Sequence, residues 1–539
     1  MLLCLLLLLA PVSPAPPEIK ILLDTVREGK VEACGRNFIS NKKTIPSPVY
    51  FSLAGSSVVV EDPCGRRTVY NGSVLLDPGA DACFKIKNKS YRGKVLLAAG
   101  AKHLLIINQL SIEDYLQGVV PAEMGPREYP SLEALKAQAV AARSYALAKL
   151  RHPDNALYHL CATPVCQAYE GMDIEKPMST QAVQETKGLV LKDARNFVVE
   201  AFFTATCGGH TTLGSNLFPA GPVSDQFPSQ PCFALPTFHV EGRDKSRLNP
   251  PGAAASVLWG GELIGGFGRT FGLKLDAGDP CSGLLEFFGG GPGNCAALFA
   301  LPMFREAHVG HLAEIKDEVL LWDIAARMLV ESERLQKKTG IVSVINGDGK
   351  LLLVEESPQP LCFVADKPAL FVRRNAALAN VAALSLNPGD RVELWMEDET
   401  IVALVKEEPT MGESADGRAK LERWLRYLSF AEIGEKTGVR GVKLLEVEKT
   451  TDEGRVLALK IIGESGSRTL ERLDVRFKLG LPEILFKVLP VNGGVFFLGG
   501  GWGHGVGMCQ EGAFGMGAYG LDFKTILNYY YPNFSLEPF

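Results

Sequence analysis

The first hundred residues alternate apolar and polar positions, the pattern of half-buried β-strands. Such runs lie at Ile19–Leu23, Val58–Val60, Val95–Leu97 and Leu104–Ile106. Turn signals such as Asn71-Gly72 separate the runs. We therefore expect a β-rich region over residues 18–110.

A helical pattern begins at residue 111. Ser111 stands three positions before Asp114, an arrangement that predicts a capped helix start. Pro121 disfavours helix in the residue before it, so this helix is expected to end near Val120. Glu123 would then lie on a loop just after the helix.

A second, longer helix is predicted to start at Pro130 and Ser131. Its apolar face is rich in alanine and comprises Leu132, Leu135, Ala139, Ala142, Ala146 and Leu150. Small residues on that face favour close packing against another element. Arg143 and Tyr145 are more polar than this helix needs.

The pattern beyond residue 179 predicts mixed elements. Helices are expected near residues 179–187, 315–338 and 421–428, with a last helix that Asp522 caps and that runs through Tyr530. Short strands over residues 341–408 have the rhythm of a small β-barrel of the SH3 type. Residues 408–418 are interpreted as a linker. The fold class is therefore α+β, a core of mixed strands and helices with an inserted β-rich domain.

Composition narrows the functional classes. The 539 residues leave room for about three domains, and a chain that is 46% hydrophobic and 22% charged can bury a core. The net charge of −5 argues against a nucleic-acid partner, which needs a basic face. A neutral or zwitterionic substrate fits better.

The N-terminus has the character of an export signal. The apolar run Met1–Ala10 has the length of a signal-peptide core and is too short to span a bilayer. Ser13-x-Ala15 is an acceptable cleavage site, so residues 1–17 are expected to be removed. Export to the periplasm, cell wall or medium follows, with membrane attachment only if the leader stays uncleaved.

The cysteines do not form a disulfide scaffold. Twelve are present, and Cys4 lies in the leader, so eleven remain in the mature chain. An odd number excludes complete pairing within the chain. Cys161-x4-Cys166 is the only tight pair and is either a disulfide or half of a metal site.

Two distant motifs carry the most chemical information. The first is Tyr115–Met124, and the second is the glycine-rich stretch Gly501–Gln510, which contains Trp502 and His504. Glycines let the backbone approach a ligand closely. The second stretch lacks the Gly-Lys-Ser/Thr of a phosphate loop, so nucleotide binding is discounted.

Together with residues 132–146, Cys161–Tyr169 and Cys207–Thr211, these motifs resemble the SpoIID/LytB family of stage II sporulation proteins and amidase enhancers. Five motifs occur in one order, and the resemblance covers roughly residues 20–340 and 420–535. The β-rich insert between these parts is outside the usual pattern of the family. The expected domains are therefore a signal peptide over residues 1–17, an N-terminal β-rich part over 18–110, a catalytic core over 111–340, an inserted β-rich domain over 341–410, and a C-terminal part of the core over 411–539.

The resemblance implies a lytic transglycosylase that cleaves peptidoglycan glycan strands, with Glu123 as the catalytic residue. The carboxyl group would protonate the glycosidic oxygen and then take the proton of the C6 hydroxyl, which closes a 1,6-anhydro ring. No water attacks, so the second carboxylate of ordinary glycosidases is not required. Partial burial beside Val119, Val120 and Met124 is expected to raise the pKa of Glu123.

The other candidate site residues are substrate contacts. Arg143 would orient an acetamido or lactyl group, and its alternative is a salt bridge. His504 would donate to sugar hydroxyls, or else stabilise the glycine-rich turns. Tyr145, Tyr169 and Gln510 complete the predicted set.

No cofactor is required by this chemistry, and a structural zinc ion is the one candidate. Some family members bind zinc with a histidine directly before the second cysteine, where this chain has Val165. His152 and His159 would have to complete a site with Cys161 and Cys166, and a disulfide is the alternative. The rival function is a non-catalytic wall-binding protein that enhances a partner amidase.

Overall fold

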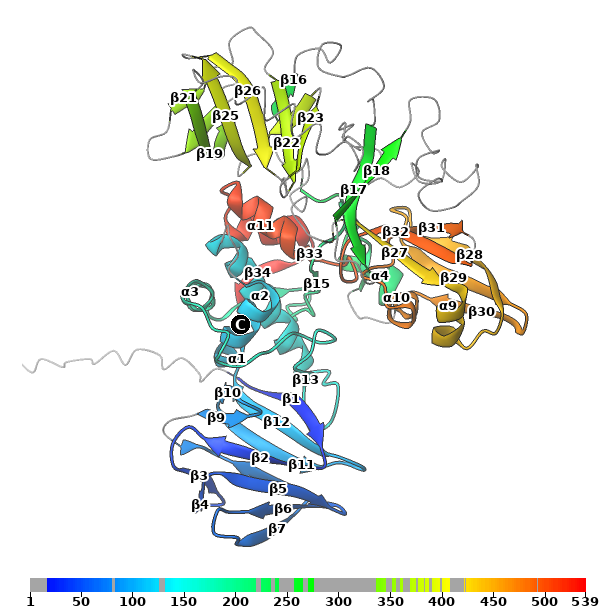
Figure 1. Ribbon diagram of the computed structural model, residues 1–539. Helices are drawn as coiled ribbons and strands as arrows, with labels where there is room; N and C mark the ends of the chain where they lie inside the picture. The colour runs from blue at the N-terminus through cyan, green and yellow to red at the C-terminus, as the bar shows by residue number, and fades with distance from the viewer. Residues whose placement is uncertain are drawn as a thin grey trace, which may run out of the picture. The chain divides into compact units, whose positions relative to one another are not determined.

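The computed structural model describes residues 17–79, 83–125, 131–219, 224–233, 421, 423–491 and 493–539, together with shorter stretches between 238 and 407 (Figure 1). These residues divide into two compact units. The first comprises residues 1–128, 138–201 and 535–539, and the second comprises residues 129–137 and 202–534. The predicted leader lies outside the described residues.

The first unit contains two antiparallel-rich sheets in contact with each other, drawn in blue and cyan in Figure 1. One has the order β13-β1-β12-β11-β8, and only its β1–β13 pair is parallel. Its strands are β1 (Glu18–Val26), β8 (Ser73–Leu76), β11 (Lys94–Ala99), β12 (Leu104–Ser111) and β13 (Leu160–Cys161). The other, in the order β10-β9-β2-β5-β6-β7, consists of β2 (Glu28–Ala33), β5 (Val49–Ala54), β6 (Ser57–Glu61), β7 (Arg67–Asn71), β9 (Cys83–Ile86) and β10 (Lys89–Arg92). A hairpin of β3 (Asn37–Ser40) and β4 (Lys43–Pro46) accompanies them.

The first unit also contains the helices α1 (Ile112–Glu123) and α3 (Pro177–Glu185), and α2 (Leu132–Lys149) belongs to it from Gln138 onward. The predicted cap is confirmed, because the Ser111 side chain accepts a hydrogen bond from the backbone of Asp114. The predicted end at Val120 is wrong, since α1 continues through Pro121 to Glu123. Pro121 removes only its own backbone donor, and Met124 closes the last turn with a bond to the Val120 carbonyl at 2.8 Å.

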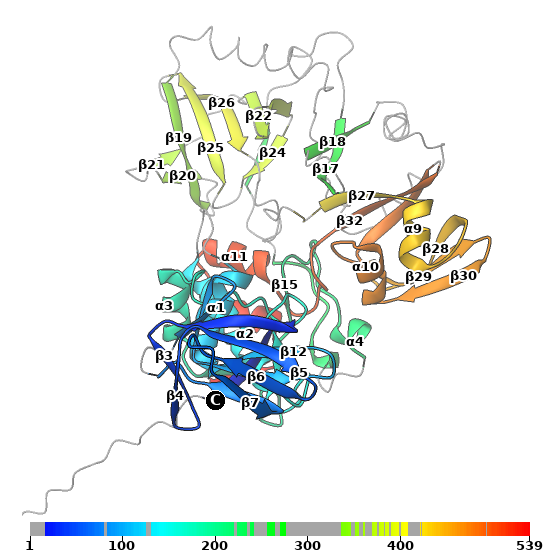
Figure 2. The same cartoon turned by 60° about the horizontal axis from the view of Figure 1, so that its bottom comes forward.

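The second unit contains three larger sheets. A five-stranded sheet, β18-β17-β27-β32-β31, consists of β17 (Ser256–Ile264), β18 (Thr270–Leu275), β27 (Arg423–Ser429), β31 (Phe486–Val491) and β32 (Gly494–Gly500). A three-stranded sheet consists of β28 (Val442–Thr450), β29 (Val456–Gly463) and β30 (Gly466–Glu471). Helices α9 (Phe430–Thr437) and α10 (Leu473–Leu479) lie against this sheet (Figure 2).

The strands expected at residues 341–408 form one seven-stranded sheet. Its order is β21-β20-β19-β25-β26-β22-β23. The strands are β19 (Gln336–Ile345), β20 (Leu351–Val354), β21 (Gln359–Leu361), β22 (Ala369–Arg374), β23 (Ala377–Val381), β25 (Arg391–Glu397) and β26 (Thr400–Glu407). Strand β24 (Ala383–Leu386) pairs instead with β16 (Phe238–Glu241). The mixed α/β class is confirmed, and the SH3-type barrel stays a prediction.

Two predicted helices need correction. The helix predicted at residues 421–428 is strand β27, because Trp424 and Leu428 are buried on one face of the strand while it pairs with β32. The helix begins only at Phe430, where Ser429 and Glu432 form a capping box. The predicted helix 315–338 lies mostly outside the described residues, and its described end, 336–338, belongs to β19.

The C-terminal segment follows the glycine-rich loop. It contains β33 (Met508–Cys509), α11 (Gln510–Ala518), α12 (Phe523–Tyr530) and β34 (Ser535–Pro538). The Asp522 cap predicted for the last helix is confirmed by its bond to the backbone of Thr525. Strand β33 pairs in parallel with β15 (Phe203–Thr204), and β34 pairs with β14 (Leu189–Lys192). A short helix, α4 (Gly214–Leu217), and a 3-10 turn, Ser224–Gln226, complete the described elements of this region.

Candidate active site

Glu123 is the last residue of α1 and is partly buried. Its Oε1 atom accepts a hydrogen bond from the backbone N–H of Ala168 at 2.5 Å. The apolar neighbours expected around it, Val119, Val120 and Met124, are all fully buried. The carboxyl group therefore lies at the edge of an apolar core and is held in orientation by a backbone donor.

Two tyrosines lie within electrostatic reach of this carboxyl group. Burial, then the neighbouring Tyr169 and Glu123, raise the pKa of Tyr115 well above its ordinary value. Burial, Glu200, Asp154 and Glu123 likewise raise the pKa of Tyr145. Both phenols therefore stay protonated at neutral pH, and the buried hydroxyl of Tyr115 donates to Gln167 Oε1 at 3.2 Å.

The sequence reasoning missed an ion-pair cluster next to Tyr145. Lys149 Nζ lies 2.8 Å from Glu200 Oε1, 3.3 Å from Asp154 Oδ1 and 5.7 Å from the Tyr145 ring centre. Burial alone would lower the pKa of Lys149, but Glu200 and Asp154 raise it above its usual value. No motif could have revealed this cluster, because Glu200 lies far from Lys149 and Asp154 in the chain and meets them only in the fold.

Arg143 is completely buried and its guanidinium is engaged within the fold. It forms a two-point ion pair with Glu113, at 2.9 and 2.8 Å, and donates to the Val183 and Leu189 carbonyls. These contacts join α2 to α1 and to the segment around α3, which matches the salt-bridge alternative. The predicted contact with a substrate acetamido or lactyl group stays a prediction.

The other predicted tyrosines differ in exposure. Tyr169 is only 3% exposed, and its hydroxyl donates to Asn108 Oδ1 at 2.9 Å. Its ring lies against Tyr115, with ring centres 4.9 Å apart, and leaves no room for a Cβ at Gly118. Tyr145 is partly exposed, so of these two it is the better placed to contact a ligand.

Cys161 and Cys166 form a disulfide, one of the two alternatives that the sequence left open. Both sulfur atoms are thereby occupied. The Nδ1 atom of His159 accepts a hydrogen bond from the backbone of Lys20 at 3.0 Å, so this nitrogen is engaged within the fold. A second disulfide joins Cys34 to Cys83.

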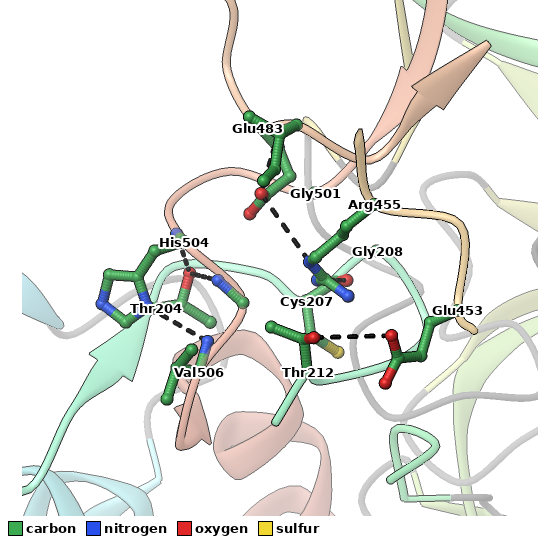
Figure 3. Close-up of polar contacts among 12 residues, drawn as sticks. Thr204, Cys207, Gly208, Thr212, Glu453, Arg455, Glu483, Gly501, His504 and Val506 are labelled. Atoms are coloured by element: carbon green, nitrogen blue, oxygen red, sulfur yellow. Dashed lines mark hydrogen bonds and ion pairs between the residues drawn. The ribbon is translucent and has the colours of Figure 1, made fainter. Parts of the chain in front are cut away.

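In the second unit the glycine-rich loop is held by Thr204 of β15 and by the ring of His504 (Figure 3). The hydroxyl of Thr204 accepts hydrogen bonds from the backbone N–H groups of His504 and Gly505, at 3.1 and 3.2 Å. His504 Nδ1 accepts from the Val506 backbone at 3.0 Å, so this nitrogen is not the protonated one. Burial and the positive charges of Arg476 and Arg455 lower the pKa of His504 to about 3. This is the loop-stabilising arrangement, and donation to sugar hydroxyls stays a prediction.

Arg455 and Glu483, which the sequence did not single out, lie beside this loop (Figure 3). Both are fully buried, and Arg455 Nε lies 3.7 Å from Glu483 Oε1. Arg455 also donates to the Cys207 carbonyl at 2.9 Å. Burial raises the pKa of Glu483, although Arg455 and Arg476 act in the opposite direction.

Two further residues of the loop differ in exposure. Gln510 is 4% exposed at the first turn of α11, and its predicted sugar contact stays a prediction. Trp502 is 51% exposed, which leaves its ring accessible.

The second unit also contains a cluster of three buried cysteines, Cys207, Cys232 and Cys509. Their sulfur atoms lie within 4.8 Å of one another and could hold a metal ion.

The structure thus places a partly buried helix-terminal carboxyl group in the first unit, in the segment that also holds α2. Residues 100–192, which include Glu123 and Arg143, match the family model for SpoIID, stage II sporulation protein. Residues 415–507 match a domain of unknown function, DUF8618, which includes His504. The chain therefore carries a SpoIID domain, as its motifs indicate.

Two relatives share part of the chain. An uncharacterized protein of Brachyspira hyodysenteriae is 36% identical over 178 residues, which are 32% of this chain and 47% of that protein. The amidase enhancer of Bacillus subtilis is 37% identical over 105 residues, which are 19% of this chain and 13% of that protein. The similarity thus spans about half the length of the first relative and a small part of the second.

The SpoIID domain places the chain in a cell-wall context. Two disulfides are consistent with export, because such bonds persist in oxidising compartments. Within the part of the chain that the structure describes, no helix combines the length and the apolar character needed to cross a membrane.

Proposed function

We propose that the chain is an exported lytic transglycosylase that cleaves peptidoglycan glycan strands between N-acetylmuramic acid and N-acetylglucosamine. The observation that carries the proposal is the setting of Glu123, a partly buried carboxyl group oriented by the Ala168 backbone inside the SpoIID domain. A single residue that acts as both acid and base must be held in a fixed position, and it does not need a second carboxylate.

The reaction balances with one carboxyl group. Protonated Glu123 gives its proton to the glycosidic oxygen, and the bond to the muramic C1 breaks with its electron pair on that oxygen. The resulting carboxylate then removes the proton from the C6 hydroxyl, whose oxygen bonds to C1. The products are a 1,6-anhydromuramic end and a free glucosamine end, and Glu123 is protonated again.

The tyrosines and the hydrogen bond from Ala168 support this cycle. The fixed N–H at Oε1 stabilises the carboxylate formed after the first proton transfer. Tyr145 is protonated and partly exposed, and the proposal gives its hydroxyl the role of a donor to a substrate oxygen. Arg143 would act indirectly in this proposal, by holding α2 against α1.

The test is mass spectrometry of purified glycan strands, with and without stem peptides, after incubation with the mature protein. Wild-type protein should produce anhydromuramic ends, and Glu123→Gln should lower the rate by at least about a hundredfold because the acid is gone. Glu185→Gln, an exposed carboxylate on α3, is the matched control and should cleave normally. If Glu123→Gln cleaved the strands as fast as the wild-type protein, Glu123 would not be the catalytic acid.

A second function is favoured by one observation. Trp502 exposes half of its surface in the glycine-rich loop, and aromatic rings stack on sugar faces. A wall-binding protein that enhances an amidase would need such a contact and no acid. This alternative would be favoured if the wild-type protein binds glycan strands and leaves them intact. Binding should then be lost in Trp502→Ala and kept in the control Phe477→Ala. Phe477 is a suitable control because it is 59% exposed on α10.

A further inference from the structure

Three cysteines from distant segments meet in the interior of the second unit. Cys207 precedes the Gly208-Gly209 turn, Cys232 lies 25 residues later, and Cys509 ends β33. Their sulfur atoms lie within 4.8 Å of one another, and all three side chains are buried. No chemical role for any of the three follows from the sequence alone.

The fold provides hydrogen-bond donors for a negatively charged sulfur in this cluster. Cys509 is the N-cap of α11, a helix of nine residues, and its Sγ accepts from the backbone of Gly512 at 3.3 Å. The backbone of Cys207 donates to the same sulfur at 3.3 Å. Helix N-termini and backbone donors favour the thiolate, which is the form that binds metals.

The packing also brings the helix close to the other sulfurs. A Cβ at Gly512 would lie 3.0 Å from Cys232 Sγ and 2.1 Å from the Tyr530 hydroxyl, so glycine is needed there. The Tyr530 hydroxyl is 3.8 Å from Cys232 Sγ. The three sulfurs are therefore enclosed by backbone and by one phenol.

A positive charge lies near the backbone of Cys207. Arg455 donates to the Cys207 carbonyl (Figure 3). Its buried Nη1 atom has no hydrogen-bond partner among the residues that the structure describes. Three thiolates and a divalent cation carry one net negative charge. The buried guanidinium of Arg455, which also pairs with Glu483, would offset part of that charge.

We propose that Cys207, Cys232 and Cys509 form a structural zinc site. In a tetrahedral site with Zn–S bonds of about 2.3 Å, ligand sulfurs lie about 3.8 Å apart, so contractions of about 1 Å or less would complete the geometry. The fourth position falls to water or to the Tyr530 hydroxyl. The ion would tie the Cys207-Gly208-Gly209 turn and the Cys232 segment to the glycine-rich loop, independently of any glycan cleavage.

The main rival is a disulfide between two of the three. The chain already has disulfides elsewhere, so its compartment is oxidising, and three neighbouring thiols cannot all pair with one another. Bound zinc accounts for all three cysteines at once. A disulfide between two of the three would account for only those two.

The test uses the full mature chain. After dialysis against a weak chelator, elemental analysis should find about one zinc per chain. Cobalt substitution should give the thiolate charge-transfer band and the intense visible bands of a tetrahedral site. Cys232→Ser and Cys509→Ser should lose both signals, whereas Cys64→Ser, an exposed cysteine of the first unit, should keep them.

Three results would overturn the proposal: wild-type protein without zinc, unchanged zinc in Cys232→Ser, or a disulfide within the triad. The last is read by alkylation of the unreduced, denatured protein followed by peptide mass spectrometry. If the serine variants do not fold, the metal content and the cobalt spectrum of wild-type and Cys64→Ser protein still decide the question.

Discussion

Ala168 donates its backbone N–H to Glu123 Oε1 across 45 positions of sequence, and this bond fixes the direction of the candidate catalytic carboxyl group. The donor follows the Cys161–Cys166 disulfide closely in the chain. The orientation of Glu123 therefore depends on a loop that a covalent bond constrains.

Shortening this side chain should separate acidity from position. Glu123→Asp keeps the carboxyl group but withdraws it by one methylene, so the bond to Ala168 cannot form in the same geometry. We expect the rate of anhydromuramic formation to fall about a hundredfold while the protein stays folded. Activity equal to wild type would show that the position of the carboxyl group is not important, and circular dichroism controls for folding.

Removing the buried cation at position 143 should destabilise the first unit. Arg143→Met leaves Glu113 without its partner, and we expect a loss of about 3–5 kcal/mol in the free energy of unfolding. Arg195→Met is the control, because Arg195 is exposed and its pair with Asp193 should contribute about 1 kcal/mol or less. Urea unfolding followed by circular dichroism measures both, and equal losses would contradict the prediction.

The glycine at position 505 is required by both backbone and space. Its φ of 73° lies in the left-handed region, and a Cβ would lie 2.1 Å from Arg455 Nη2. Gly505→Ala should cost about 2–3 kcal/mol or more, because the guanidinium must move. Gly520 also has a positive φ, but a Cβ there would meet open space. Gly520→Ala should therefore lower the free energy of unfolding by only about 1 kcal/mol. Comparable unfolding curves for the two variants would argue against the clash.

His504 should make the stability depend on pH. Its pKa is about 3 in the folded protein and about 6.5 when unfolded, so the unfolded state binds the extra proton between these values. The stabilisation is complete above pH 6.5 and is lost as the pH falls toward 3.

Replacing this histidine should flatten that dependence. Between pH 6 and pH 4, the unfolding free energy of His504→Gln should fall less steeply than that of wild type, by up to about 1.4 kcal/mol per pH unit. The exposed His103 offers the comparison, since His103→Gln should keep the wild-type slope. Identical slopes in all three proteins would mean that His504 takes up its proton in the folded state.

The sequence pattern predicted the structural features that depend on residues close together in the chain. The caps at Ser111 and Asp522 and the alternating N-terminal strands could be predicted because they depend on neighbouring residues. Residues 421–428 were predicted as a helix because the short apolar run fits either period. The segment is a strand because it pairs with β32, about 70 positions away, and a pattern of neighbouring residues does not contain that information.

The candidate site shows the same division. The motif alone names Glu123 as a candidate, whereas Glu200 reaches Lys149 at the end of α2 only in the folded chain. His504 was recognised as important, but the bond from Val506 to its ring nitrogen follows from loop geometry. The odd number of cysteines indicates that they cannot all form disulfides within the chain. Only the fold shows which three lie close together.

The pairing of β34 with β14 bears on how the chain acquires its structure as it is made. Residues 535–538 complete a sheet whose partner strand begins at Leu189, and both strands belong to the first unit. A chain that leaves a ribosome or a membrane channel from its N-terminus presents β14 more than 300 residues before its partner arrives. During that interval the edge of β14 is not paired with β34, so the sheet closes late. A chaperone that covers this edge would have its greatest effect then.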